Sequence, residues 1–74
     1  MDNKKIDAKI IASNIKTLRE SLNLSQEEMA YELGYSDRQI RRIERDGTNS
    51  ISVVNYIAET FNVSAISILM QDAF

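Results

Sequence analysis

Two helix-start signatures lie only eleven residues apart in this chain, with a single glycine between them. Ser25 is followed three residues later by Glu28, and Ser36 is followed in the same way by Gln39. Each pair has the pattern of a capping box, in which each side chain accepts a hydrogen bond from the other residue's backbone N–H. Gly34 stands between them, and glycine ends helices because it adopts the left-handed conformation without steric cost. The stretch predicts two short helices joined by a tight turn.

The flanking segments also have the apolar spacing of helices. We expect one helix from Asp7, which caps it, to about Ser21, and another over 51–61 after a turn-rich loop. A fifth, short helix is expected from Ser64 to about Gln71. The sequence has no proline and only two glycines, so no long irregular segment is expected. The predicted fold class is all-α, a compact five-helix bundle.

Composition excludes several classes of function. With 74 residues the chain makes one domain, which we place at residues 9–74 after a flexible N-terminal tail of residues 1–8. Cysteine and histidine are absent, which removes disulfides, thiolate metal sites and the commonest general base. We therefore expect no enzyme activity, no metal and no cofactor. Neither a signal peptide nor a membrane-spanning run is visible, so a cytoplasmic location without membrane contact is predicted.

Charge is unevenly distributed along the chain. The formal net charge is −2, yet residues 46–74 contain no basic residue. The distribution of charge bears on nucleic-acid binding more than the net value does, because binding depends on a local basic surface. The nine basic residues are Lys4, Lys5, Lys9, Lys16, Arg19, Arg38, Arg41, Arg42 and Arg45.

The central stretch resembles a known family. Counting from Gln26, a small residue falls fifth (Ala30), glycine ninth (Gly34), and isoleucines fifteenth and eighteenth (Ile40 and Ile43). This pattern is similar to the helix-turn-helix of phage-repressor and Cro-type regulators, the XRE family, whose fold is that of the lambda repressor. The resemblance implies a regulator that binds specific double-stranded DNA, most simply a repressor that occupies a palindromic operator as a homodimer.

The resemblance also assigns roles to residues by position. In the family the third helix enters the major groove, and its early residues read base edges. The implied base-contacting residues are Asp37, Arg38, Gln39 and Arg42. The implied phosphate-contacting residues are Gln26, Arg41, Arg45, Thr48, Asn49, Ser50, Lys16 and Arg19.

Other interpretations of these residues stay open. Arg41 and Arg45 can instead pair with Asp37, Glu44 or Asp46, as exposed arginines commonly do. Asp37 suits a helix N-terminus through the helix dipole, but phosphates would repel it. The net acidity favours a second function class, a small helical protein-interaction module that is antitoxin-like or regulates a partner.

The C-terminal run is more apolar than one buried stripe requires. If Ile66 and Leu69 face the core, then Ile68, Met70 and Phe74 are partly exposed. They would form a dimer seam or face a domain outside this chain; alternatively, the last helix simply packs around the domain and no such role is needed.

Overall fold

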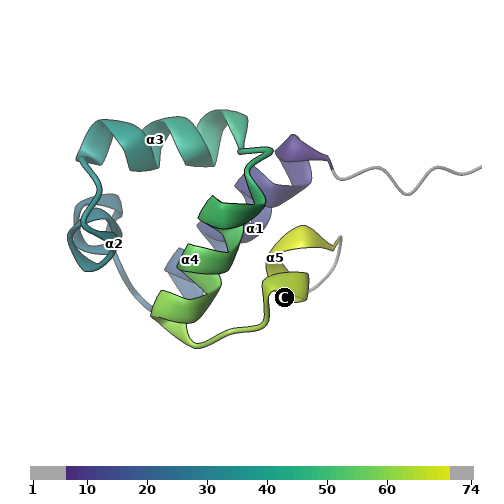
Figure 1. Ribbon diagram of the computed structural model, residues 1–74. Coiled ribbons are helices and arrows are strands. Elements are labelled where there is room, and N and C mark those ends of the chain that lie inside the picture. Colours follow the sequence, from purple (N-terminus) through teal and green to yellow (C-terminus); the bar gives the residue numbers. More distant parts are fainter. Residues whose placement is uncertain (1–6, 71–74) are drawn as a thin grey trace, which may run out of the picture.

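The computed structural model describes residues 7–70, which form five helices (Figure 1). No helix in this part of the chain is both long and apolar enough to cross a bilayer. The predicted all-α, five-helix architecture is confirmed. The helices are α1 (Ala8–Ser21), α2 (Gln26–Leu33), α3 (Asp37–Asp46), α4 (Ile51–Phe61) and α5 (Ala65–Leu69).

Both predicted capping boxes are present at the start of α2 and α3. The Glu28 N–H donates to Ser25 Oγ at 3.0 Å, and the Ser25 N–H donates to Glu28 Oε1 at 2.8 Å. The Gln39 N–H donates to Ser36 Oγ at 3.1 Å, and the Ser36 N–H donates to Gln39 Oε1 at 2.8 Å. Gly34 ends α2 in the left-handed conformation, at φ 72°. Local sequence alone therefore accounts for the break and restart of the chain between α2 and α3.

Several predicted boundaries need small corrections. Asp7 caps α1 as expected, because its Oδ1 accepts from the Lys9 N–H, and the helix begins at Ala8, inside the segment that we assigned to the tail. The rest of the predicted tail, residues 1–6, lies outside the described residues. Helix α5 ends at Leu69 rather than Gln71.

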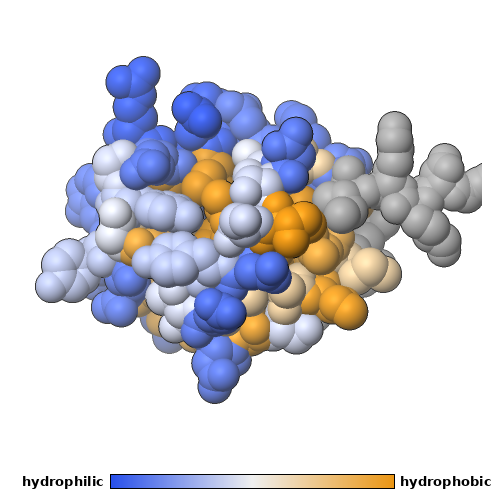
Figure 2. Space-filling view, viewed as in Figure 1, coloured by the Kyte–Doolittle hydropathy of each residue, from blue (hydrophilic) through white to orange (hydrophobic). Residues whose placement is uncertain are grey.

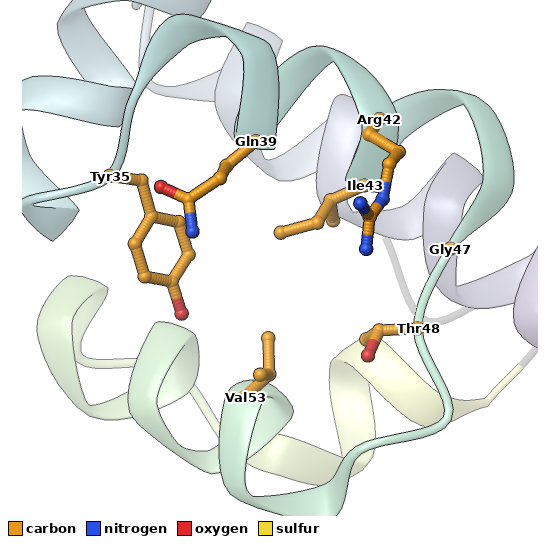
Figure 3. Close-up of a pocket in the computed structure, with 7 residues that line it drawn as sticks. All are labelled: Tyr35, Gln39, Arg42, Ile43, Gly47, Thr48 and Val53. Atoms are coloured by element: carbon orange, nitrogen blue, oxygen red, sulfur yellow. The ribbon is translucent and has the colours of Figure 1, made fainter.

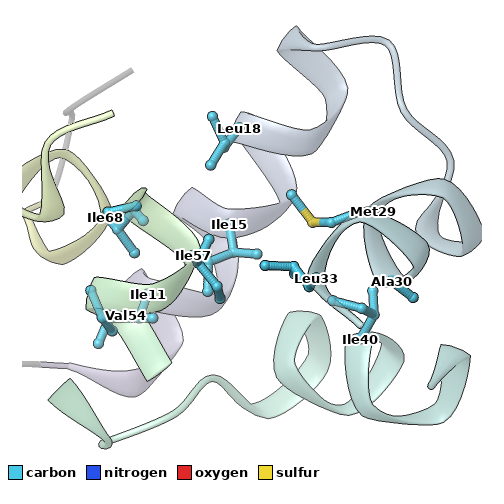
Figure 4. Close-up of a cluster of buried hydrophobic side chains, with 11 residues drawn as sticks. Ile11, Ile15, Leu18, Met29, Ala30, Leu33, Ile40, Val54, Ile57 and Ile68 are labelled. Carbon is cyan, nitrogen blue, oxygen red and sulfur yellow. The ribbon is translucent and has the colours of Figure 1, made fainter. Parts of the chain in front are cut away.

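The core collects apolar side chains from all five helices (Figure 4). Helix α3 packs against α1 and α2, whereas α5 packs against α1 and α4. Removing apolar surface from water is the main force that holds such a domain together. The buried cluster consists of Ile11, Ile15, Leu18, Met29, Ala30, Leu33, Ile40, Val54, Ile57, Ala58 and Ile68.

Helix α5 is turned differently from our expectation. Ile68 is fully buried and Ile66 is 64% exposed, so the predicted exposure of Ile68 is wrong. A polar contact selects this orientation: Asn14 of α1, itself buried, donates from Nδ2 to the carbonyls of Ile68 at 2.9 Å and Met70 at 2.8 Å. Burial of an amide is tolerable only with such partners.

The start of α1 passes very close to Gly47, which caps the C-terminus of α3. Gly47 has φ 78° and ψ −165°, a region that essentially only glycine occupies. A Cβ atom on Gly47 would lie 1.9 Å from the carbonyl oxygen of Ala8. By contrast, nothing lies within 4 Å of a Cβ placed on Gly34. Both positions need glycine for their backbone angles, but only position 47 also needs it because the backbone of Ala8 passes so close.

The two glycines therefore make a matched pair of tests. Gly34→Ala should lower the free energy of unfolding by about 1–2 kcal/mol, the usual cost of a left-handed residue with a side chain. Gly47→Ala should cost more, at least about 3 kcal/mol, because steric overlap is added to a Gly-only conformation. Urea unfolding measures both. Equal losses would show that the approach of α1 to Gly47 does not constrain the fold.

Candidate nucleic-acid interface

The outward face of α3 carries the basic side chains. Arg38, Arg41 and Arg42 are exposed, and hydrophilic side chains line the edge of the molecule where α3 runs (Figures 1 and 2). Within residues 7–70, no ion pair or hydrogen bond engages these three guanidinium groups. Three positive charges are thus held on one short helix and left accessible to an anionic ligand.

Arg45 differs from the other arginines of α3, because it pairs with Asp46. Its Nε donates to Asp46 Oδ1 at 3.0 Å and its Nη2 donates to Oδ2 at 2.8 Å. The hydrogen bond from Arg45 holds the pKa of Asp46 below its usual value. Both side chains are more than half exposed, at 69% and 54%. Such exposed pairs are weak, so a phosphate can take the place of Asp46.

A groove runs between α3 and the start of α4 (Figure 3). It has a volume of about 230 Å³. Figure 3 shows Gln39 and Arg42 reaching into it from α3, Thr48 facing them, and Ile43 and Val53 giving it apolar walls. Tyr35 and Gly47 complete the lining. The structure therefore brings together three of the predicted DNA-contacting residues, Gln39, Arg42 and Thr48.

Two of these polar groups also hold the local backbone. The Oε1 atom of Gln39 accepts from the Ser36 N–H in the capping box, which leaves its NH₂ group as the part that can meet a ligand. The Oγ1 atom of Thr48 accepts from the Ser50 N–H at 3.1 Å, which leaves its O–H as a donor. With the guanidinium of Arg42, the groove mainly offers hydrogen-bond donors. That chemistry suits phosphate oxygens.

Arg19 is placed differently from our expectation. Its Nε donates to Glu44 Oε2 at 2.6 Å, its Nη2 donates to Glu44 Oε1 at 3.1 Å, and its Nη1 donates to the Leu24 carbonyl at 2.9 Å. The side chains of Arg19 and Glu44 are only 13% and 4% exposed. The hydrogen bonds that Arg19 donates to the Glu44 carboxylate raise the pKa of Arg19, so it stays charged. Arg19 is occupied inside the protein, and we leave it out of the proposed phosphate contacts.

The remaining predicted residues lie around α3. Gln26, the first residue of α2, donates from Nε2 to Glu44 Oε1 at 3.1 Å. Asp37 is the first residue of α3, where the helix dipole favours a negative charge. Lys16 is exposed on α1 and Asn49 is exposed in the α3–α4 connection. Ser50 caps α4 by accepting from the Val53 N–H at 3.2 Å.

Sequence reasoning missed the role of Glu44, although a signal for it was present. Glu44 follows Ile40 by four residues, so it falls on the core-facing side of α3. A carboxylate at such a position is buried and needs a cation as partner. Tyr35 was not among the predicted site residues either. Its ring packs beside Tyr56 with centroids 5.8 Å apart, at the edge of the groove.

Comparison with known proteins assigns the family. A family model described as helix-turn-helix, HTH_3, matches residues 15–67. The chain belongs to this family. The fold is therefore that of an HTH_3 (XRE-family) helix-turn-helix domain, a class of DNA-binding domains that are typically not enzymes.

Individual relatives agree with the family. The HTH_3 chain superposes on a hypothetical transcription factor, NHTF, from Neisseria with a TM-score of 0.80 and 25% identity, covering 97% of this chain and 83% of that one. An HTH_3 family transcriptional regulator from Vibrio cholerae matches with a TM-score of 0.72 and 30% identity over 84% of this chain and 35% of that one. Antitoxin PezA of Streptococcus pneumoniae serotype 4 (strain ATCC BAA-334 / TIGR4) is 38% identical over 65 residues, 85% of this chain. The chain spans only 40% of the length of that antitoxin.

The placement of Arg19 inside the protein leads to a stability prediction. Arg19→Ala should lower the free energy of unfolding by about 3 kcal/mol or more, because it leaves the Glu44 carboxylate buried without its cation. Lys16→Ala, an exposed change on the same helix, should stay within about 0.5 kcal/mol of the parent. Urea unfolding followed by circular dichroism compares them. Similar losses for the two variants would contradict the assigned difference.

Proposed function

We propose that this HTH_3 domain binds specific double-stranded DNA and regulates transcription, most simply as a repressor. The observation that carries the proposal is the outward face of α3. Arg38, Arg41 and Arg42 stand on the second helix of a helix-turn-helix, exposed and without an intramolecular partner in residues 7–70. In helix-turn-helix proteins this helix lies in the major groove of DNA.

The proposed contacts divide into base and phosphate contacts. Arg38 and Arg42 are four residues apart in the first two turns of α3, and arginine can donate two hydrogen bonds to O6 and N7 of guanine. Asp37 and Gln39 are proposed to adjoin the same bases. Gln26, Lys16, Arg41, Arg45 and the connection of Thr48, Asn49 and Ser50 are proposed to meet phosphates. The hydroxyl that Thr48 presents in the groove between α3 and α4 supports the phosphate contact of this connection.

Dimerisation is proposed through α5. With Ile68 buried, the candidates for the seam are Ile66 and Met70, which are 64% and 57% exposed and four residues apart. Figure 2 shows hydrophobic surface over the region of α5. Phe74, which we also predicted for the seam, lies outside the described residues. A two-fold dimer would read an inverted repeat with half-sites about 34–36 Å apart.

Selection of bound duplexes from a random-sequence DNA pool, at roughly physiological salt, tests the proposal. We expect an inverted repeat whose half-sites are about one helical turn apart. The Met70→Glu variant should keep the fold and select a single half-site, because its charge opposes the apolar seam. A single half-site with the parent chain would place the dimer contact elsewhere. No enrichment with folded protein would contradict sequence-specific DNA binding.

Replacing each of two arginines of α3 by alanine should change DNA binding in a different way. Arg38→Ala should relax the preference at one base position per half-site, with about 1–3 kcal/mol of discrimination lost. Arg41→Ala should weaken binding to all DNA sequences alike. It should also reduce the magnitude of the slope of log affinity against log salt by about 0.9, the value for one phosphate contact. Titrations of the selected duplex and of single-base variants at several salt concentrations separate the two. Equal weakening on every duplex by Arg38→Ala would mean that Arg38 contacts only phosphate.

The similarity to antitoxin PezA favours a second function, in which the chain forms part of an antitoxin-like protein that binds a partner protein. The net charge of −2 and the lack of basic residues after Arg45 also favour it. Salt distinguishes the two functions. Binding to DNA weakens steeply as salt rises because counterions are released from phosphates, whereas binding to a protein surface has no such requirement. The two activities are compatible if they use different faces.

A further inference from the structure

One buried carboxylate joins three segments of the domain behind the DNA-facing surface. Glu44, on the third turn of α3, accepts from Arg19 of α1 and from Gln26 of α2. Arg19 extends the network to the Leu24 carbonyl in the α1–α2 connection. Glu44 is only 4% exposed, so water does not compete strongly for its oxygens. The helix proposed to read bases and the residue proposed to hold a phosphate therefore share a direct contact.

The contact sets the orientation of the Gln26 amide. An ionised carboxylate only accepts hydrogen bonds, so Glu44 turns the NH₂ end of the amide towards itself. The same NH₂ group carries a second N–H, which is left to donate elsewhere. The two hydrogen bonds from Arg19 prevent the carboxylate from rotating away. Arg19 also balances the charge of Glu44, so a nearby phosphate meets a neutral pair.

We propose that Glu44 is a positioning residue for DNA binding, which orients Gln26 so that its remaining N–H meets a backbone phosphate. This rests on the proposed DNA-binding function. The consequence is mechanical. Because Glu44 belongs to α3, the phosphate contact at the start of α2 fixes the position of α3 in the major groove. Phosphate contacts in general set the register in which base contacts form.

The test needs a variant that removes the carboxylate without unfolding the domain. Replacing both members of a buried ion pair by apolar residues is often neutral or stabilising, unlike removal of one member. The paired variant Arg19→Met with Glu44→Leu leaves net charge unchanged and removes the acceptor for Gln26. Gln26→Ala is made in the parent chain and in the paired variant. Urea unfolding checks the fold of each, and titration of the selected duplex at fixed salt gives Kd.

In the parent chain, Gln26→Ala should weaken binding roughly tenfold, as expected for loss of one charge-assisted hydrogen bond. The paired variant should unfold like the parent but bind about three- to tenfold more weakly on every duplex. In the paired variant, Gln26→Ala should weaken binding little further, because the Gln26 amide has already lost its orientation.

Other results would overturn the proposal in recognisable ways. A folded paired variant that binds as tightly as the parent would show that Glu44 only stabilises the fold. An equal loss from Gln26→Ala in both backgrounds would show that Gln26 acts without Glu44. If Gln26→Ala binds like the parent, then Gln26 makes no phosphate contact and needs no positioning.

If the paired variant unfolds, Glu44→Gln provides the second measurement, since a neutral amide no longer fixes which end of the Gln26 amide faces it. In the Glu44→Gln background, Gln26→Ala should weaken DNA binding by a smaller factor than it does in the parent, and an equal factor would contradict the proposal.

Failure of the parent chain to bind DNA would refute the proposed function instead.

Discussion

The buried ion pair between Arg19 and Glu44 adds a directional contact to the apolar packing of α1, α2 and α3. It places a charged group inside a domain that is too small to bury charge without close partners. Four hydrogen bonds within the protein surround it: Arg19 donates two to Glu44 and one to the Leu24 carbonyl, and Gln26 donates one to Glu44. Apolar packing holds the same helices together but is not directional. The ion pair adds direction, and together with the burial of Ile40 it favours one rotation of α3 relative to α1.

That rotation determines which residues of α3 face outward. With Ile40 in the core and Glu44 against Arg19, the arginines at 38, 41 and 42 are left on the solvent side. Arg42 also reaches into the groove that α3 forms with Thr48 and Val53, so the groove adjoins the exposed arginine face. A helix with the same sequence but a different rotation would bury an arginine or expose an isoleucine. The candidate interface is thus a consequence of packing on the other side of the helix.

Much of the fold was predictable because its signals are local. Capping boxes at Ser25 and Ser36, the glycine at 34, and apolar spacing within each helix require only neighbours in sequence. The failures involved long-range contacts. Ile68 was expected to be exposed because a five-residue helix has too little periodicity to define a face. The rotation of this helix is set by hydrogen bonds from Asn14, which is 54 and 56 residues away from the two carbonyls that accept them. Arg19 was expected at the DNA surface because its partner is 25 residues distant.

The sequence by itself determined where helices begin and end, the all-α class and the helix-turn-helix family, since each is encoded by residues within about one or two turns of each other or by a fixed spacing. It also determined that basic charge would concentrate on the helix after Gly34. Only the tertiary structure decided which of the arginines remain available to a ligand. Arg19 is taken by Glu44 and Arg45 is lightly held by Asp46, whereas Arg38, Arg41 and Arg42 have no such partner within residues 7–70. The reason is physical: a charge is available or occupied according to its neighbours in space, and those neighbours come from different helices.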